Sequence, residues 1–180
     1  GCYDLGEDAD DDNDGVADLL DSCLGDLNWT SNSSTDWDSD GCQDSGEDTD
    51  DDDDSVEDDL DSCPTGDLGW SSTNATDWDS DGCLDSTEDP DDDNDGVIDT
   101  MDWCYLGETG WTSNSSTDVD SDGCQDSGED TDDDNDGVAD ASDLCEKTAL
   151  GSAVLDNGCV DSDGDMVADV FDSCPYGMYG

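Results

Sequence analysis

Acidic residues recur along this chain at spacings that suit a bound cation. Between Asp36 and Glu47, carboxylates occupy positions 1, 3, 5, 9 and 12 of a twelve-residue segment, and glycine occupies position 6. This is the order of oxygen ligands in twelve-residue calcium loops, in which position 7 contributes a backbone carbonyl and the glycine permits a sharp turn. The segment is therefore predicted to bind a calcium ion.

Two versions of this segment alternate along the chain: first loops end in glutamate and second loops end in aspartate. The candidate ligands of the three first loops are Asp36, Asp38, Asp40, Cys42, Asp44 and Glu47; Asp77, Asp79, Asp81, Cys83, Asp85 and Glu88; and Asp118, Asp120, Asp122, Cys124, Asp126 and Glu129. Those of the five second loops are Asp10, Asp12, Asp14, Val16, Asp18 and Asp21; Asp50, Asp52, Asp54, Val56, Asp58 and Asp61; Asp91, Asp93, Asp95, Val97, Asp99 and Asp102; Asp132, Asp134, Asp136, Val138, Asp140 and Asp143; and Asp161, Asp163, Asp165, Val167, Asp169 and Asp172.

Three positions depart from this pattern. Ser55 and Met166 replace the glycine at position 6, so these two turns are expected to be strained or differently shaped. A half-site at Asp4 and Glu7 lacks its leading acids. A solvated acidic tail is the alternative interpretation of so many like charges, but such tails do not keep glycine at position 6 and valine at position 7.

Calcium is favoured over magnesium because oxygen cages built wholly from protein suit the larger ion. Eight complete loops predict eight ions, whose sixteen positive charges fall far short of the formal net charge of -57, so more than eight ions are expected. Further acids between the loops could bridge a second ion or face solvent: Asp8, Asp11, Asp48, Asp51, Asp89, Asp92, Asp130 and Asp133.

The overall composition excludes several classes of protein. Of 180 residues, 58 are acidic and one, Lys147, is basic, while Leu, Ile, Val and Phe make up about 13%. No ordinary hydrophobic core can form from this composition, and binding to nucleic acid or to an anionic membrane is excluded because both need basic residues. Without histidine or arginine, the chain is not expected to be an enzyme. No stretch suits membrane insertion or a signal peptide.

A repeat of 41 residues organises the chain as a single array. Residues 35–75, 76–116 and 117–157 are three copies, residues 1–34 hold a front-truncated unit with its spacer, and residues 158–180 hold a shortened unit. Hydrophobic residues follow neither a helical nor a strand period, so little regular secondary structure is expected beyond short helical turns after the Asp-Gly pairs. The predicted fold is an irregular, linear array stapled by calcium and disulfides.

The two residues between Glu47 and Asp50 cannot hold the helices of an EF-hand. The combination of DSC, a spacer, DxDxDGC and DDDNDGVxDxxD instead resembles thrombospondin type 3 repeats over nearly the whole chain. The resemblance implies an extracellular, calcium-dependent array wrapped round its ions, with neighbouring cysteines paired in sequence order. Spacers with tryptophan and glycosylation sequons are not part of the usual family pattern, so the chain resembles a divergent, microbial surface version.

Ten evenly spaced cysteines indicate a disulfide framework in an oxidising compartment, and zinc is not expected because the chain has no CxxC pair and no histidine. Two ladders are possible: one begins with Cys2–Cys23 and Cys42–Cys63 and closes each pair of loops. The other closes each spacer, by Cys23–Cys42, Cys63–Cys83, Cys104–Cys124 and Cys145–Cys159. The family resemblance favours the second ladder.

The second ladder leaves Cys2 and Cys174 without partners in the chain. Cys174 of one copy could bond Cys2 of the next and complete the half-site there. Such a head-to-tail contact does not close and would build a filament, so a secreted or cell-surface fibre is the expected function. In the alternative, the chain is a calcium-rigidified stalk or adhesion segment of a larger surface protein. Because it begins at Gly1, we expect a mature or excised piece of a secreted precursor.

The spacers carry two further kinds of candidate residue. Sequons at Asn28, Asn32, Asn74 and Asn114 would accept N-glycans in a secreted protein. Tryptophans recur in and beside the spacers and are expected to pack over the loops and disulfides as a local core. They are Trp29, Trp37, Trp70, Trp78, Trp103 and Trp111.

Overall fold

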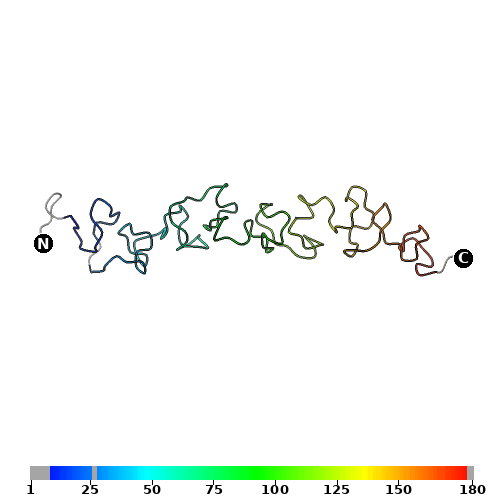
Figure 1. Cartoon of the computed structure of the whole chain (residues 1–180), viewed down its shortest axis with the longest axis horizontal. Helices are drawn as coiled ribbons and strands as arrows, with labels where there is room; N and C mark the ends of the chain where they lie inside the picture. Colours follow the sequence, from blue (N-terminus) through cyan, green and yellow to red (C-terminus); the bar gives the residue numbers. More distant parts are fainter. Residues whose placement is uncertain (1–8, 26–27, 178–180) are drawn as a thin grey trace. The chain divides into compact units, whose positions relative to one another are not determined.

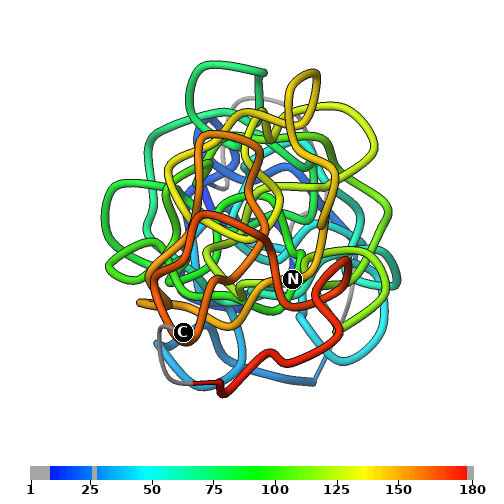
Figure 2. The ribbon, with the colours of Figure 1, turned by 90° about the vertical axis from the view of Figure 1, so that its right-hand side faces the viewer.

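The computed structural model describes residues 9–25 and 28–177. Within these ranges the chain forms neither a helix nor a strand, and its only β-bridge is the antiparallel pair of Val154 and Val160. The ribbon is a succession of irregular loops (Figure 1). No sheet or helix layer is visible in either view of the described residues (Figure 2). The predicted irregular, disulfide-linked fold is confirmed.

Short turns follow the Asp-Gly positions, as expected. In the second loops, the backbone N–H of Leu20 donates to the carbonyl of Ala17 at 2.7 Å, and Met101 donates to Ile98 at 2.7 Å. Each turn ends within a few residues because the next acidic residues use their side chains to hold backbone N–H groups, which competes with helix propagation.

Four disulfides have formed, and they follow the second of the two predicted ladders: Cys23–Cys42, Cys63–Cys83, Cys104–Cys124 and Cys145–Cys159. Cys174 is exposed and carries a free thiol. Its proposed partner Cys2 and the half-site at Asp4 and Glu7 lie outside the described residues. Each disulfide therefore encloses a spacer, and the first three join the end of a second loop to the following first loop.

Contacts divide the chain into two compact units, residues 1–90 and 91–180. The division falls between the loop that ends at Glu88 and the loop that begins at Asp91, inside the sequence repeat 76–116. It leaves every described disulfide within one unit. Chain contacts thus group each second loop with the first loop that follows it, across the spacer.

The interior consists of carboxylates and disulfides. Among the described residues, the buried apolar ones are four half-cystines and one alanine: Cys42, Cys83, Cys124, Cys159 and Ala168. Nine aspartates are at most 2% exposed: Asp14, Asp36, Asp52, Asp54, Asp77, Asp93, Asp95, Asp118 and Asp134. Aspartate is rarely buried unless it is paired, so this interior must be explained by what its carboxylates bind.

The tryptophans pack less closely than predicted. Trp103 is 77% exposed, so its predicted packing over a disulfide is wrong. Trp37 is 37% exposed, although its indole N–H donates to the carbonyl of Gly66 at 3.0 Å. Trp29, Trp70 and Trp111 are half-buried in the spacers.

Among the described residues, no helix has the length and apolar character needed to cross a membrane.

Candidate metal centre

All eight predicted loops share one backbone conformation. In each of them, the residues at positions 4 and 6 have positive φ. The residues at position 4 are Asn13, Ser39, Asp53, Ser80, Asn94, Ser121, Asn135 and Gly164, and those at position 6 are Gly15, Gly41, Ser55, Gly82, Gly96, Gly123, Gly137 and Met166. Ser55 (φ 84°) and Met166 (φ 73°) thus adopt the same left-handed turn as glycine, with the strain expected of side-chain-bearing residues. The alternative, a differently shaped turn, is wrong.

Hydrogen bonds from backbone N–H groups to carboxylates hold this conformation in every loop. The position 5 carboxylate accepts the backbone N–H of position 7 throughout, as in Asp54 to Val56 at 2.7 Å. The position 9 carboxylate likewise accepts the N–H of position 2, as in Asp58 to Asp51 at 2.9 Å. One oxygen of position 9 therefore closes the loop.

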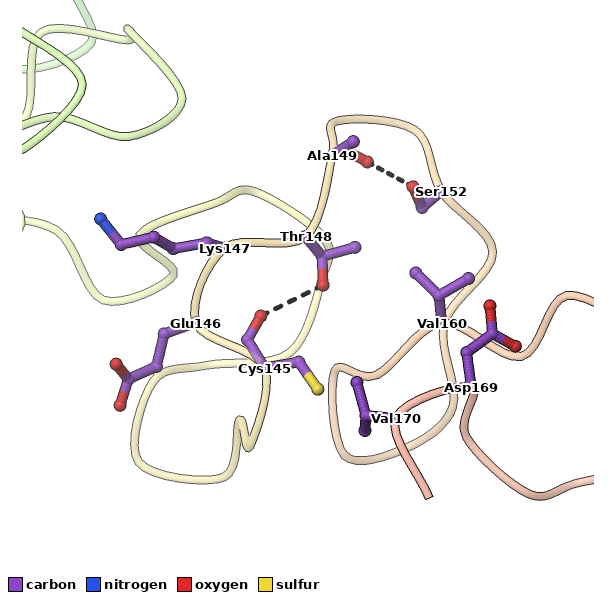
Figure 3. Close-up of a pocket in the computed structure, with 9 residues that line it drawn as sticks. All are labelled: Cys145, Glu146, Lys147, Thr148, Ala149, Ser152, Val160, Asp169 and Val170. Atoms are coloured by element: carbon purple, nitrogen blue, oxygen red, sulfur yellow. Dashed lines mark hydrogen bonds between the residues drawn. The ribbon is translucent and has the colours of Figure 1, made fainter. Parts of the chain in front are cut away.

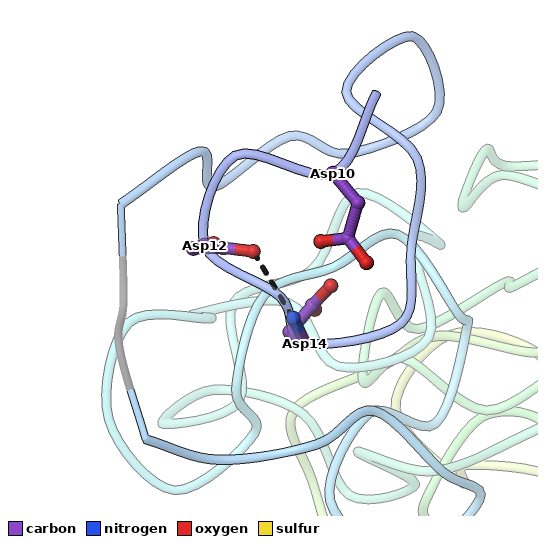
Figure 4. A group of neighbouring side chains, drawn as sticks. All are labelled: Asp10, Asp12 and Asp14. Carbon is purple, nitrogen blue, oxygen red and sulfur yellow. Dashed lines mark hydrogen bonds between the residues drawn. The ribbon is translucent and has the colours of Figure 1, made fainter. Parts of the chain in front are cut away.

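Carboxylates at positions 1, 3 and 5 converge in the loops. One oxygen from each member of such a triad lies within 4.8 Å of the others, as in Asp10, Asp12 and Asp14 (Figure 4). The same holds for Asp36, Asp38 and Asp40; for Asp50, Asp52 and Asp54; and for Asp77, Asp79 and Asp81. Like charges repel at this distance, so these groups are expected to share a positive charge.

The loop 10–21 provides the clearest test of whether a cation fits. Asp10 Oδ1, Asp12 Oδ2, Asp14 Oδ2 and Asp21 Oδ2 are buried oxygens without a hydrogen-bond partner. They come from positions 1, 3, 5 and 12, which are the carboxylate positions of the calcium pattern. Burying an anionic oxygen without a partner is costly, and native proteins pair buried charges or coordinate metals with them. The residues of this loop therefore fit a hard divalent cation.

Position 12 differs between the two kinds of loop. In second loops its Oδ1 accepts the N–H of the nearby cysteine, and its Oδ2 is buried without a partner in Asp21, Asp61 and Asp102. In the first loop 77–88, Glu88 accepts the N–H of Leu84 at 3.3 Å and that of Asp67 in the spacer at 2.6 Å. The first-loop glutamate therefore also anchors the preceding spacer, a role that the sequence pattern did not reveal. Carboxylate oxygens have further lone pairs with which to bind a cation.

The acids between loops meet in a further cluster. Asp44, Asp48 and Asp51 are half-buried and each offers an oxygen within 4.8 Å of the other two. Asp44 belongs to a first loop and Asp51 to the second loop that follows it. These acids were expected either to share an ion or to face solvent. The geometry of the cluster agrees with a shared ion. Asp8 lies outside the described residues.

The electrostatic cost of this interior appears in the pKa values of its carboxyl groups. Burial, together with the like charges of Asp52 and Asp50, raises the pKa of Asp54 from 3.8 to about 6, and the hydrogen bond from Val56 acts in the opposite direction. Burial likewise raises the pKa of Asp61 to about 6 and that of Asp102 to about 7. Each site therefore stabilises positive charge, whether as protons or as metal.

Without a divalent cation, acid should favour the folded arrangement. A carboxyl group with a raised pKa binds its proton more tightly in the folded chain, so its stabilising contribution is complete below about pH 4 and is lost as the pH rises through about 6 to 7. In EDTA, we expect a smaller hydrodynamic radius at pH 5 than at pH 8, by dynamic light scattering. Millimolar calcium should abolish the difference, and a larger radius at pH 5 would contradict this account.

The last disulfide encloses a spacer of a different kind. Residues 152–160 form a small hairpin closed by the Val154–Val160 bridge, and beside it lies a cavity of about 510 Å³ (Figure 3). Its lining includes Lys147, Val160 and Val170. Where first loops have aspartate at positions 1, 3 and 5, the aligned residues are Ala153, Leu155 and Asn157. This spacer therefore leads into no metal-binding first loop.

Comparison of the sequence with protein-family models gave no match, and comparison with curated proteins found no significant relative. The structure by itself shows an irregular chain of aspartate-rich, disulfide-linked units that repeat with a period of about 41 residues, in which many aspartate triads could hold metal ions. The four disulfides are consistent with an oxidising, extracellular setting.

Proposed function

We propose that this chain is an extracellular structural protein whose repeat array is held in shape by bound calcium. The observation that carries the proposal is that loop 10–21 holds four buried carboxylate oxygens without a hydrogen-bond partner, and that three of the four side chains, Asp10, Asp12 and Asp14, converge. The same loop conformation occurs eight times. With one basic residue in the whole chain, the charge that balances this interior must come from outside it.

Calcium suits these loops better than other common cations. Each loop offers only oxygen ligands, and many of them, which is the preference of calcium rather than of zinc or of the strongly hydrated magnesium ion. Extracellular calcium modules bind at roughly 10⁻⁴ to 10⁻³ M, a range that matches the millimolar calcium outside cells. The disulfides also favour this compartment. Eight or more ions per chain are expected.

We further propose that copies associate head to tail into a filament. The N–H of Cys174 donates to Asp172 Oδ1 at 2.8 Å, just as Cys63 donates to Asp61 at 2.6 Å. Cys63 is bonded to a cysteine of the following loop, whereas the thiol of Cys174 is free and exposed. Cys174 is thus presented as at the other junctions, and Cys2 of a second copy is the proposed partner. A heterologous contact of this kind propagates without closing.

Electron microscopy tests the filament directly. In millimolar calcium and air-saturated buffer, whose dissolved oxygen takes up the two electrons and two protons released when the two thiols form a disulfide, we expect the purified chain to form fibres. We expect Cys174→Ser to shorten them severely. A Ser173→Cys, Cys174→Ser variant is a matched control that keeps a thiol but moves it by one residue. Unassociated single chains in calcium would contradict the filament and favour the alternative, a calcium-rigidified stalk or adhesion segment of a larger surface protein.

Glycosylation of the spacers is part of this proposal. The side chains of Asn28, Asn32, Asn74 and Asn114 are all exposed, as acceptors must be. Asn32 already donates its amide N–H to Thr30 and Thr35, at 2.9 and 2.8 Å. A glycan on Asn32 would therefore have to share that amide nitrogen.

A further inference from the structure

Three structural links join each of the second loops 10–21, 50–61 and 91–102 to the first loop beyond the next spacer. One is the disulfide, as in Cys63–Cys83 with its Cα atoms 5.2 Å apart. Another is a backbone hydrogen bond from the residue before the first cysteine, such as Ser62 N–H to the carbonyl of Asp81 at 2.6 Å. The equivalent bonds are Ser22 to Asp40 at 2.7 Å and Trp103 to Asp122 at 2.8 Å. The two loops are therefore in direct contact despite their separation in sequence.

A spacer serine supplies the third link. Ser72 donates its N–H to the position 5 carbonyl, Asp54, of the second loop at 2.7 Å, and its hydroxyl to the position 1 carboxylate, Asp77, of the first loop at 2.5 Å. Ser113 connects Asp95 to Asp118 in the same way, at 2.8 and 2.5 Å. Ser31 connects Asp14 to Asp36. A candidate metal ligand of one loop is thereby tied to a candidate ligand of the other.

Burial of the carboxylates follows this pairing. At position 5, the side chains of Asp14, Asp54 and Asp95 are completely buried, and so are the position 1 side chains of their partner loops, Asp36, Asp77 and Asp118. Burial and nearby like charges raise the pKa of Asp54, and Asp77 of the partner loop is among those charges. Each loop of a pair thus shields the other from water.

Two second loops have no such partner and provide an internal contrast. The loop 132–143 is followed by the hairpin that lacks the acids, and its position 5 residue, Asp136, is only half-buried. In the last loop, 161–172, the equivalent Asp165 is exposed. The backbone turn is the same in all five second loops. Complete burial at position 5 therefore depends on a partner loop and not on the loop's own sequence.

We infer that calcium fills the array as three coupled pairs and two independent sites, an inference that rests on the proposed calcium-binding function. The coupled pairs are loops 10–21 with 36–47, 50–61 with 77–88, and 91–102 with 118–129. The independent sites are loops 132–143 and 161–172, because no disulfide or bridging serine among the described residues joins either of them to a first loop. Loop 132–143 contacts the loop before it through hydrogen bonds from Asn135 to Asp120 and Asp122. When one loop of a pair loses its ion, its buried carboxylates repel one another and the contact with the other loop is disturbed. The ligands of the other loop then no longer hold their ion in place. Coupling of this kind acts equally in both directions.

The partner in this scheme is not the nearest loop in the sequence. Only Asp48 and Thr49 separate the loops 36–47 and 50–61, yet no disulfide or bridging serine joins those two. The structural unit of calcium binding is thus a second loop, its spacer and the following first loop. Sequence repeats that begin at Thr35, Thr76 and Thr117 divide this unit.

Counting bound ions in matched variants tests the inference. Asp54→Ala and Asp136→Ala remove the same position 5 carboxylate from a paired and from an unpaired loop. With the full, disulfide-intact chain at the lowest calcium concentration that saturates it, native mass spectrometry should show two ions lost from Asp54→Ala and one from Asp136→Ala. By reciprocity, Asp77→Ala should also lose two ions. The non-reduced mass verifies that each variant keeps four disulfides, and near-ultraviolet circular dichroism in calcium verifies that it has folded.

The possible failures are distinct. If the unaltered chain binds no calcium, both the proposed function and the pairing are overturned. If it binds calcium but Asp54→Ala loses a single ion, the loops are independent and only the pairing is overturned. Loss of three or more ions from Asp54→Ala would also overturn the pairing, because coupling would then extend along the array.

Discussion

Chelation of calcium should abolish the ordered structure of this chain even though its disulfides remain intact. At about 2 mM calcium and a dissociation constant of about 10⁻⁴ M, each bound ion contributes about 2 kcal/mol. Eight such sites together equal or exceed the 5 to 15 kcal/mol that typically stabilises a folded domain. The buried apolar residues, five in the part of the chain that the structure describes, cannot compensate for that loss.

Near-ultraviolet circular dichroism of the tryptophans is the measurement of choice. Trp29, Trp70 and Trp111 are half-buried beside the loops and should lose their signal in EGTA, whereas the exposed Trp103 contributes little in either state. The hydrodynamic radius should rise in the same step, because the formal charge of -57 is then balanced only by mobile counterions. Calcium should restore both quantities, and magnesium at equal concentration should not. Spectra and radius unaffected by EGTA would remove the basis for the metal-held array.

Local patterns made most of the binding loops predictable from the sequence. Alternate acids with glycine at position 6 specify a loop through contacts within twelve residues, and the predicted loop positions coincide with the eight repeated turns. The sequence pattern does not predict the left-handed residue at position 4, because asparagine, serine, aspartate and glycine all occur there. These residues share a tolerance of left-handed backbone rather than one side chain.

That pattern does not predict the contacts between loops. The spacing of the cysteines allowed two ladders, and only a resemblance selected the correct one. Ser72 hydrogen-bonds to Asp54 on one side of the spacer and to Asp77 on the other. The repeat of the sequence does not indicate that these residues are its partners. Trp103 was assigned to a local core because of its residue type, yet it is 77% exposed. Long-range packing in a chain without a hydrophobic core has no strong signature in residue type.

A glycine at position 6 proves to have two distinct roles, which explains where it is replaced. At Gly15 and Gly137 of second loops, an added Cβ would meet nothing within 4 Å, and two other second loops carry Ser55 and Met166 there. All three first loops keep glycine. An added Cβ on Gly82 would lie 2.1 Å from Asp61 Oδ1 of the paired second loop.

Gly82→Ala should therefore be far more damaging than Gly137→Ala. Both residues have positive φ, at 89° and 95°, so each substitution costs about 1 to 2 kcal/mol in backbone strain. In Gly82→Ala, the Asp61 carboxylate must also move away from the new methyl group and lose the hydrogen bond that it accepts from the Cys63 N–H. This overpacking costs roughly a further 1 to 3 kcal/mol. It also displaces Asp61, the candidate ligand at position 12. We expect a lower thermal midpoint in calcium than for Gly137→Ala and loss of calcium from the loop 50–61.

The same contact persists where the first-loop acids are gone, which supports a packing role for this glycine separate from metal binding. Gly158 of the C-terminal hairpin has a φ of 76°, and an added Cβ would lie 1.9 Å from Asp143 Oδ1. Gly158→Ala should consequently destabilise the chain as Gly82→Ala does, while the ion count falls by at most the one ion of loop 132–143. Equal melting midpoints for Gly82→Ala, Gly158→Ala and Gly137→Ala would show that backbone strain alone fixes these glycines and that the contact between loops contributes nothing.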